Sequence, residues 1–487
     1  MALLTFLLCL PIAGVVVIAL FPAGHPRLVR VIALFSSGGA LLFSAGLISR
    51  FTFSAELQFS EHIPWNSELG TAFRLGLDGF SFPMVLLATL LCFVALLVSK
   101  AEKFQSRAYY SLMLLLESAM LGVFMAQDWS LFYIFWELTL LPLFFLIDRW
   151  GGERRNQAAL NFVLYTMGGS VFMLISLLVI FDSMPGHSFS MGDMTAAAQA
   201  LPVQVQTLIF LGFLLGFGVK MPIFPLHGWL PLAHVEAPSP VSILLSGILL
   251  KMGAYGLIRA ATMLPDAVMN LQPLLVGLAL FSLIYGALLA WRQSDMKKMI
   301  AYSSISHMGI VLLGIAALNV AGLTGAMMQM IAHGLVAGAL FLLIGLLYER
   351  THSRDINHYS SLIQVTPRFA FFTSMALLAG IGIPGSVGFV AELHALIGGF
   401  ERWGWLMLLV SVSVMINAAW SIRTLGRLFT GPVRENMRKV QDLQTVELFA
   451  AGVLMSGILL LGIFPSYALD MISASVLELS GLFGALV

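Results

Sequence analysis

The sequence predicts an all-α integral membrane protein with about 14 transmembrane helices. Of its 487 residues, 59% are hydrophobic and only 10% are charged, against roughly 25% charged residues in an ordinary soluble domain. The mean hydropathy of +0.94 excludes a soluble fold, because the surface of such a fold would carry very large apolar patches. The apolar residues also fall into runs of about 20, which is the length of a helix that crosses a bilayer.

Cutting the chain at its polar and Pro/Gly-rich interruptions gives the individual spans. The first span has no basic segment before it and no small-residue cleavage site after it, so we expect an anchor and not a signal peptide. Residues 466–487 are expected to form an amphipathic tail. The predicted spans are 2–21, 31–50, 79–99, 108–126, 128–148, 157–182, 204–226, 240–262, 270–291, 299–318, 322–348, 368–397, 404–429 and 447–465.

The distribution of Lys and Arg predicts the orientation of these spans. Counting loops from the N-terminus, 19 of the 25 basic residues lie in or beside odd-numbered loops, whereas only Arg50, Arg74, Arg259 and Arg402 lie in the even ones. The positive-inside rule therefore places the odd loops in the cytoplasm and both termini on the opposite side. The odd-loop residues are Arg27, Arg30, Lys100, Lys103, Arg107, Arg149, Arg154, Arg155, Arg292, Lys297, Lys298, Arg350, Arg354, Arg368, Arg423, Arg427, Arg434, Arg438 and Lys439.

Several classes of function are excluded by composition and spacing. A net charge of +1 without a polybasic run excludes nucleic-acid binding through a basic face. Cys9 and Cys92 are too few for an iron–sulfur cluster or a four-ligand zinc site. The run Gly380–Gly385 has the glycine spacing of a dinucleotide fingerprint, but it follows no soluble strand and contains Pro384. We therefore expect no cofactor and no metal in this chain itself.

The candidate functional residues are ionisable groups inside predicted spans. Lys220 and Lys251 fall near the middle of spans, and Glu137 and Glu392 also lie in apolar runs; Glu117 is a weaker case. Such groups are expensive in hydrocarbon, and they commonly mark ion or proton pathways. Five histidines lie at or near membrane depth: His227, His234, His307, His333 and His394.

Structural interpretations of the same residues stay open. Glu137 and Lys220 could simply join two helices by hydrogen bonds. His307 and His333 could be neutral imidazoles that are bonded to a neighbouring hydroxyl or carbonyl group. For Glu117, which has no obvious partner, the structural interpretation is preferred.

Two predicted spans contain helix breakers. Lys220–Pro225 interrupts the seventh span with two prolines, and Gly380–Gly385 interrupts the twelfth. Proline lacks an amide donor, so the freed backbone groups must face protein or water. The breaks are five spans apart, which predicts two inverted five-helix repeats. The expected organisation is residues 1–107 for spans 1–3, 108–262 for the first repeat (spans 4–8), 263–439 for the second repeat (spans 9–13), and 440–487 for span 14 and the tail.

Several motifs together make the sequence similar to a known family. They are Phe135-Trp136-Glu137, Lys220–Pro231, Leu249–Gly256, Ala301–Gly309 and Ala332-His333-Gly334. These stretches resemble the antiporter-like proton-pumping subunits of respiratory complex I (NDH-1, the NAD(P)H–quinone oxidoreductase). The family also includes subunits of Mrp-type cation/proton antiporters and of membrane-bound hydrogenases. The resemblance covers nearly the whole chain.

One residue narrows the resemblance to a branch of the family. The L- and N-type subunits usually carry a lysine at the position of Glu392, whereas a glutamate resembles the M-type branch, which is also called chain 4. That branch includes the D-type subunits in photosynthetic and CO2-uptake complexes of cyanobacteria. One departure is Leu232, where the family commonly has an aspartate, so a proton relay through the end of the seventh span is in doubt.

The resemblance implies a proton route but no catalytic residue in this chain. Glu137 would lie beside Lys220 and tune its protonation, because a nearby carboxylate favours the charged lysine while burial favours the neutral one. Lys251 would pass the proton along the central axis. The complete implied set is Glu137, Lys220, Lys251, His307, His333 and Glu392, with His227, His234 and Glu236 as auxiliary polar groups.

The second half of this route would consist of the two histidines and Glu392. His307 and His333 would carry the proton onward, and Glu392 would be the exit site. Quinone reduction, with flavin and iron–sulfur centres, is expected in partner subunits. The implied partners are neighbouring antiporter-like subunits and a peripheral electron-transfer arm, in a bacterial plasma membrane or a cyanobacterial thylakoid membrane with plastoquinone.

Two other functions remain open from the sequence. The first is a subunit of a Mrp-type monovalent cation/proton antiporter or of a membrane-bound hydrogenase. The second is a membrane scaffold whose charges only hold helices together. If the chain is only a scaffold, proton pumping should stay normal after Lys220 and Lys251 are neutralised.

Overall fold

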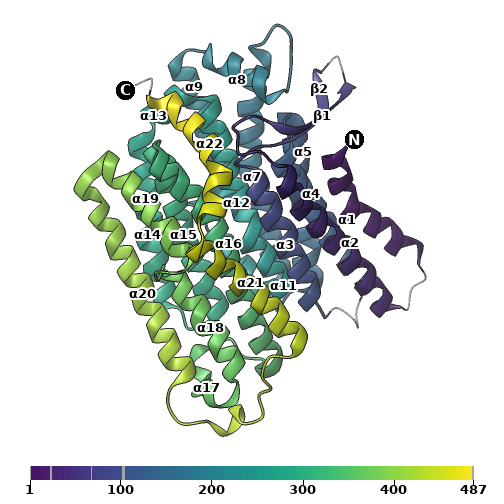
Figure 1. Cartoon of the computed structure of the whole chain (residues 1–487), viewed down its shortest axis with the longest axis vertical. Helices are drawn as coiled ribbons and strands as arrows, with labels where there is room; N and C mark the ends of the chain where they lie inside the picture. Colours follow the sequence, from purple (N-terminus) through teal and green to yellow (C-terminus); the bar gives the residue numbers. More distant parts are fainter. Residues whose placement is uncertain (1, 22–24, 67–68, 101–104, 485–487) are drawn as a thin grey trace. The chain divides into compact units, whose positions relative to one another are not determined.

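The computed structural model of the chain describes residues 2–21, 25–66, 69–100 and 105–484. Lys103 and the last three residues of the predicted tail, 485–487, lie outside these ranges. The described residues form helices joined by short connections, together with one small antiparallel sheet (Figure 1). The predicted all-α membrane class is confirmed.

The spans of the structure correspond to the predicted ones. Among the described residues, twelve helical segments are long and apolar enough to cross a membrane. Helix α3 (Phe82–Val98) is apolar but shorter, with 17 residues. The segment Val387–Phe429 counts once among the twelve, although it contains two helices that meet at a 3₁₀ turn. With α3 included and this segment divided, each of the fourteen predicted spans has a counterpart.

The chain divides into two compact units. Unit 1 consists of Met1–Met221, Ile248–Leu274 and Asp470–Val487. Its elements are α1 (Leu3–Leu20), α2 (Pro26–Leu47), η1 (Ile48–Arg50), β1 (Gln58–Asn66), β2 (Thr71–Leu77), α3, α4 (Ser106–Met125), α5 (Trp129–Leu138), α6 (Leu140–Trp150), α7 (Arg155–Asp182), α8 (Met191–Gln199), α9 (Val203–Lys220), α12 (Leu250–Met263), α13 (Pro265–Asn270) and most of α22 (Ser466–Gly484). The two predicted repeats, 108–262 and 263–439, would be related by symmetry. The two compact units reflect only how tightly parts of the chain pack together, so they do not test the repeats.

Unit 2 consists of Pro222–Gly247 and Leu275–Leu469. Its elements are α10 (Leu230–Glu236), α11 (Ser239–Leu244), most of α14 (Gln272–Arg292), α15 (Met296–Ala317), α16 (Val320–Thr351), η3 (Ile356–His358), α17 (Leu362–Val365), α18 (Pro367–Gly380), α19 (Val387–Trp403), η4 (Gly404–Met407), α20 (Leu408–Phe429), η5 (Glu435–Met437) and α21 (Thr445–Ile463). A π-helical turn, η2 (Leu245–Leu249), leads from α11 into α12.

Both predicted helix breaks are present. Helix α9 ends at Lys220, and the next helix, α10, begins only at Leu230. In unit 2, α18 ends at Gly380 and α19 starts at Val387. Between them Gly382 and Gly385 have φ angles of +77° and +91°, which L-residues with a side chain rarely adopt. The twelfth span is therefore two half-helices joined by a glycine-dependent turn.

A small β-hairpin in unit 1 is absent from the predicted elements. Strands β1 and β2 pair antiparallel, with Ile63 opposite Phe73. The backbone N–H groups of Leu4 and Thr5 donate to the Glu61 carboxylate at 2.6 and 3.1 Å, so β1 also holds the start of α1. The hairpin lies in the connection between the second and third spans, which hydropathy alone marks only as a loop.

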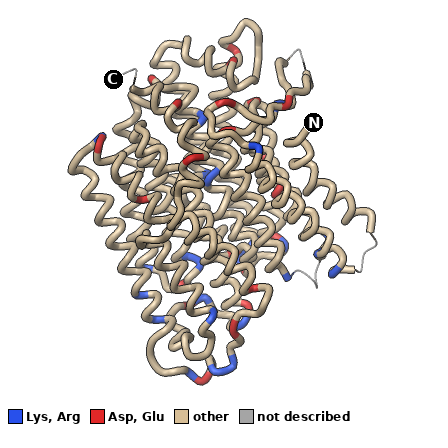
Figure 2. The backbone as a smooth tube through the Cα atoms, viewed as in Figure 1, with Lys and Arg blue, Asp and Glu red and all other residues tan. Residues whose placement is uncertain are grey.

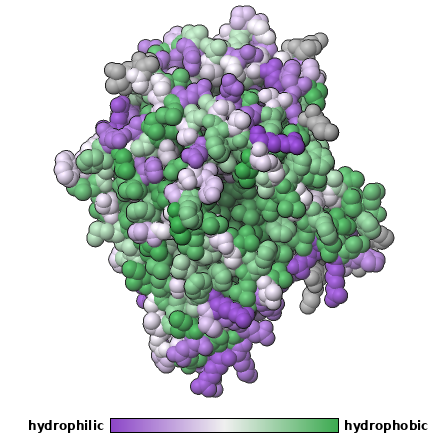
Figure 3. Space-filling model, viewed as in Figure 1, coloured by the Kyte–Doolittle hydropathy of each residue, from purple (hydrophilic) through white to green (hydrophobic). Residues whose placement is uncertain are grey.

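The surface of each unit fits a membrane protein. Large apolar side chains are exposed on α7 of unit 1 and on α20 of unit 2, and the face drawn in Figure 3 is largely hydrophobic. In unit 2, Lys and Arg gather at the end that carries α17 (Figure 2). Arg423, Arg427 and Arg434 line a surface hollow of ≈ 530 Å³ at this end. The positive-inside rule predicts that this end is cytoplasmic, and that orientation stays a prediction.

The predicted orientation can be tested within unit 1 by cysteine labelling. In a background with Cys9→Ala and Cys92→Ala, the variant Gly152→Cys, in the connection between α6 and α7, should react with an impermeant maleimide only from the cytoplasmic side. The variant Gly192→Cys in α8 should react only from the other side, and a side chain at Gly192 meets open space. The cysteine-free background is the control. Labelling of both positions from one face would contradict the span count.

Candidate functional site

Lys220 is a buried cation at the break of the seventh span. It is the last residue of α9, and only 1% of its surface is exposed. Its Nζ donates a hydrogen bond to Thr139 Oγ1 at 2.8 Å and lies 4.4 Å from the centre of the Trp136 ring. An ammonium group buried in hydrocarbon needs such partners, because an isolated charge there is very costly. These contacts stabilise the charged form of Lys220.

The partners of Lys220 come from a second helix break, between α5 and α6. Pro142 has no amide hydrogen to donate to the carbonyl of Leu138, so the helical ladder is interrupted there. Thr139 lies at this interruption and donates its own hydroxyl hydrogen to Trp136 O at 2.7 Å. The lone pairs of that hydroxyl are therefore directed to Lys220 as an acceptor. The motif around Pro142 builds a fixed cation-binding position.

Glu137 lies between these two partners in the chain. It is half-buried and close enough to Lys220 for an electrostatic interaction. It also lies within hydrogen-bonding reach of Tyr133. Its Oε1 atom makes no hydrogen bond to another described residue. The direct hydrogen bond of Lys220 thus goes to Thr139, and Glu137 supplies charge next to it.

Lys251 is completely buried in α12, directly after the π-helical turn. Helix α12 contacts the end of α9 closely: a Cβ atom at Gly253 would lie 2.6 Å from Phe217 O and 2.7 Å from Met221 N. Gly253 follows Lys251 by two residues, and Met221 directly follows Lys220. The glycine therefore allows the two lysine-bearing helices of unit 1 to approach at the level of their lysines.

Three of the predicted residues in unit 2 line one cavity. This cavity has a volume of ≈ 20 Å³, and about 10–15 Å³ is enough to hold one water molecule. The rings of His307 and His333 are 5.4 Å apart, and His307 Nδ1 is 3.0 Å from Gln329 Nε2. The polar lining consists of Ser303, His307, Gln329, His333, Glu392 and the indole of Trp420.

Glu392 depends on the glycine turn of the twelfth span. A Cβ atom at Gly382 would lie 2.6 Å from Glu392 Oε2, so the carboxylate rests directly against the backbone of the turn. Gly382 is required in the turn because of its positive φ angle. It is also required because any side chain there would collide with the Glu392 carboxylate. The two half-helices of the twelfth span thus meet at an ionisable group, as α9 does at Lys220.

The auxiliary residues lie at the other broken end in unit 2. The His234 ring is buried and stacks on Phe341 at 4.6 Å. Glu236 is also buried, and the backbone carbonyl of Ala237 accepts a hydrogen bond from Lys297 Nζ at 2.8 Å. A cation near the last carbonyl groups of a helix such as α10 interacts favourably with the partial negative charge at that end.

Three remaining polar residues of the sequence analysis have local partners. The His227 ring packs between Phe224 and Tyr285. His394 Nδ1 lies 2.7 Å from the Val390 carbonyl of its own helix. Glu117 accepts a hydrogen bond from Ser37 at 2.9 Å, in unit 1. The last contact agrees with the structural interpretation of Glu117.

Sequence reasoning missed Thr139, Gln329 and Lys297 as members of these sites. Thr139 is preceded by Glu137 and followed by Pro142 in a run that is otherwise apolar, and this pattern is a usable signal. Gln329 lies four residues before His333, on the same helical face. Lys297 looks like an ordinary cytoplasmic loop residue, and only the structure shows that it is buried.

The fold and these sites define an ion-translocating class of membrane protein, with ionisable groups at helix breaks inside the bundle. Residues 126–417 match the family described as NADH:quinone oxidoreductase/Mrp antiporter, TM. Chain 4 2 of the NAD(P)H-quinone oxidoreductase of Thermosynechococcus vestitus is 41% identical over 481 residues, which are 96% of this chain and 89% of the relative. NADH-quinone oxidoreductase subunit M of Rhodobacter capsulatus is 37% identical over 495 residues, or 98% and 96% of the two chains.

A solved structure agrees with these relatives. A chain of respiratory complex I from Thermus thermophilus with bound NADH superposes with a TM-score of 0.90 at 32% identity, covering 99% of this chain and 100% of that one. The chain therefore belongs to the NADH:quinone oxidoreductase/Mrp antiporter family, in the group of chain 4 and subunit M. The family resemblance of the sequence is confirmed. The family description includes Mrp antiporters, but both relatives above are quinone oxidoreductase subunits.

The role of Thr139 can be tested with two small substitutions. Thr139→Val keeps the size of the side chain but removes the acceptor of Lys220, and a hydrogen bond to a charged group is worth about 1.5–3 kcal/mol. We expect donor-driven proton pumping per assembled complex to fall by roughly tenfold. Thr139→Ser keeps the hydroxyl and should pump at nearly the wild-type rate. Equal pumping rates for the Val and Ser variants would show that the Thr139 hydroxyl has no role in proton pumping.

Proposed function

We propose that this chain moves protons across the membrane through the buried groups of its two units, driven by quinone reduction elsewhere in its complex. The chain is an integral, multi-pass membrane subunit of NAD(P)H–quinone oxidoreductase, in the proton-translocating chain 4 group. The observation that carries the proposed route is the position of Lys220. It is a buried lysine at a helix break, held by a hydroxyl and an aromatic ring next to a carboxylate.

In unit 1, the proposed switch is the distance between Glu137 and Lys220. Two unit charges roughly 5 Å apart attract each other by about 3 kcal/mol at an effective dielectric constant near 20. Moving one charge against 100 mV costs about 2.3 kcal/mol. Loss of this one interaction is therefore large enough to drive proton release from Lys220. Trp136, Glu137 and Thr139 belong to one break, so a single displacement of that break changes all the partners of Lys220 together.

Lys251 is the proposed next carrier in unit 1, since it is the other lysine that is buried in the middle of a predicted span. In unit 2, His307, His333 and Glu392 are the proposed carriers, and their common cavity supports this because one water molecule there would bridge groups on three helices. Imidazole can accept and donate a proton near neutral pH. The order of transfer is the one that the family resemblance implies.

The redox chemistry is proposed to lie in other subunits. Flavin, iron–sulfur centres and the quinone site would belong to a peripheral arm and its membrane anchor, with neighbouring antiporter-like subunits beside this chain. Among the described residues, no three His, Cys, Asp or Glu side chains are grouped as a metal site requires. A photosynthetic setting, with plastoquinone in a thylakoid membrane, is supported by the cyanobacterial relative. The Rhodobacter relative supports a respiratory plasma membrane instead. The subunits that co-purify with the chain will distinguish the two settings.

The central test of the route is the replacement of Lys220. In Lys220→Ala, Glu137 loses its counter-charge but can become neutral by taking up a proton, so the complex should assemble. Donor-driven proton uptake by membrane vesicles, normalised to assembled complex, should nevertheless fall well below the wild-type level. Lys220→Arg should fail as well, because a guanidinium group does not deprotonate in proteins.

The matched control is Arg155→Ala, which removes an exposed cation at the start of α7. It should leave pumping unchanged. If Lys220→Arg pumps at the wild-type rate, Lys220 is only a fixed positive charge, and the proposed relay is wrong.

The absence of redox chemistry from this chain is also testable. The purified chain should show no flavin, haem or iron–sulfur absorbance and should not bind NADH. Absorbance spectra and titration with NADH would check this, with the intact complex as the positive control. A chromophore bound to the isolated chain in a 1:1 ratio would refute the proposal that the redox chemistry lies in other subunits.

A further inference from the structure

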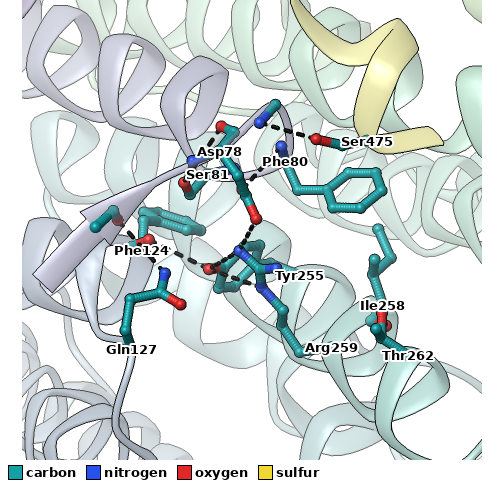
Figure 4. Close-up of polar contacts among 12 residues, drawn as sticks. Asp78, Phe80, Ser81, Phe124, Gln127, Tyr255, Ile258, Arg259, Thr262 and Ser475 are labelled. Carbon is teal, nitrogen blue, oxygen red and sulfur yellow. Dashed lines mark hydrogen bonds and ion pairs between the residues drawn. The ribbon is translucent and has the colours of Figure 1, made fainter. Parts of the chain in front are cut away.

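A buried ion pair in unit 1 has no role in the proposed route. Arg259 Nη2, on α12, lies 2.6 Å from Asp78 Oδ2, and the two side chains are only 14% and 10% exposed (Figure 4). Asp78 follows strand β2 and precedes α3. Both residues belong to predicted even-numbered loops or their flanks, which the positive-inside rule places at the non-cytoplasmic end. A buried ion pair is weak evidence for stability alone, because desolvation offsets much of the attraction.

Asp78 is held in place by its own turn. Its Oδ1 accepts hydrogen bonds from the backbone N–H groups of Phe80 and Ser81 at 3.1 and 2.9 Å. Its backbone N–H donates to Ser81 Oγ at 2.9 Å. The N–H of Gly79 donates to Ser475 Oγ of α22 at 3.1 Å. The carboxylate of Asp78 is therefore a fixed anchor for Arg259.

Arg259 also donates hydrogen bonds to the hydroxyl group of Tyr255. Its Nε and Nη2 atoms donate to Tyr255 Oη at 3.1 and 2.9 Å, while that hydroxyl donates its hydrogen to Phe124 O at 3.2 Å (Figure 4). A phenol has one hydrogen and two lone pairs. All three are engaged here, so Tyr255 cannot accept a proton from any other group while Arg259 is in place.

The same helix places Tyr255 between Arg259 and Lys251. The three residues are spaced by four, so they lie on one face of α12. A step of four residues advances about 6 Å along an α-helix, and Lys251 and Arg259 are thus about 12 Å apart along its axis. The row runs from the buried lysine to the non-cytoplasmic end of the helix.

We propose that Arg259, anchored by Asp78, is a closed gate that stops protons on Lys251 from leaving along α12 through Tyr255 to the non-cytoplasmic side. The inference rests on the proposed function, in which Lys251 carries protons. The closed gate acts in two ways: the permanent positive charge of Arg259 repels an approaching proton, and its N–H groups occupy the lone pairs of Tyr255. Withdrawal of Arg259 from Tyr255 would free that hydroxyl to relay.

A purely structural clamp is the alternative role for this pair. Removing either partner from a clamp leaves the other charge buried and unpaired, and both single variants are then damaged. A gate predicts an asymmetric result, because only Arg259 carries the blocking charge. Asp78→Asn keeps an amide oxygen that can still accept from Arg259.

The test measures passive proton leak through the assembled complex. Vesicles that contain the complex receive a pH gradient without an electron donor, and the decay of the gradient is normalised to assembled complex. Arg259→Gln should raise the leak by roughly tenfold, because it removes the electrostatic barrier. Asp78→Asn should stay within about twofold of wild type, because the barrier charge remains. Arg74→Gln, which removes a cation from β2 on the same side, is the matched control and should not leak.

Further variants keep the test decisive. If Arg259→Gln does not assemble because Asp78 is left unpaired, the double variant Asp78→Asn/Arg259→Gln contains no unpaired charge and should leak like the single Arg259 variant. Adding Tyr255→Phe to a leaking variant should restore the seal, since it removes the relaying hydroxyl. A wild-type leak in the assembled Arg259→Gln or double variant overturns the gate, and so does an equal leak in Asp78→Asn and Arg259→Gln. A failure of the Lys220 relay would appear only in donor-driven pumping, so the two proposals fail separately.

Discussion

The cost of a positive charge inside an apolar helix bundle is the constraint on which the architecture of unit 1 depends. The break at Thr139 stabilises the charged form of Lys220, because it presents a hydroxyl acceptor, an aromatic face and a carboxylate within four residues. The break itself follows from Pro142, which removes one helical hydrogen bond. The proline that interrupts the helical ladder thus lies three residues after the hydroxyl that accepts from the buried lysine.

In unit 2, the ionisable group at the helix break is an acid, Glu392, instead of a lysine. Gly382 and Gly385 open the helix with positive φ angles, and Glu392 rests against the turn so closely that a methyl group at Gly382 would collide with it. The carboxylate shares its cavity with two imidazoles and an amide. In both units the ionisable group lies where the helical ladder is interrupted. Polar backbone atoms and water then lower the cost of either protonation state, which a proton carrier must visit in turn.

Hydropathy and residue chemistry were sufficient for the spans and the two helix breaks, because each of these depends on local sequence. The choice of ionisable residues as proton carriers stays a prediction. Contacts between distant segments could not be predicted in this way. The sequence places Glu137 near Lys220 by span order, but it does not show that Thr139 takes the hydrogen bond, since that depends on the rotation of α5 against α9. The β-hairpin was missed because its short strands carry no hydropathy signal, and Lys297 because a lysine beside a loop is normally solvated. Arg259 was assigned to a loop for the same reason, although it is largely buried against Asp78.

The use of lysine and arginine along α12 has a chemical logic. A lysine can give up its proton when burial outweighs its partners, whereas an arginine keeps its charge in any protein environment. A pump needs both kinds of group, because a proton carrier at mid-membrane is useless without a seal that prevents its proton from returning passively. Lys251 and Arg259 lie on one face of one helix, with Tyr255 between them and its hydroxyl fully occupied by the arginine and the Phe124 carbonyl. Because Asp78 is fixed by the turn before α3 and that turn is bonded to Ser475 of α22, a displacement of α22 would reach Asp78 through the hydrogen bond from the Gly79 N–H to Ser475 Oγ. Helix α22 is thus connected to the ion pair that holds Arg259 beside the proposed proton path.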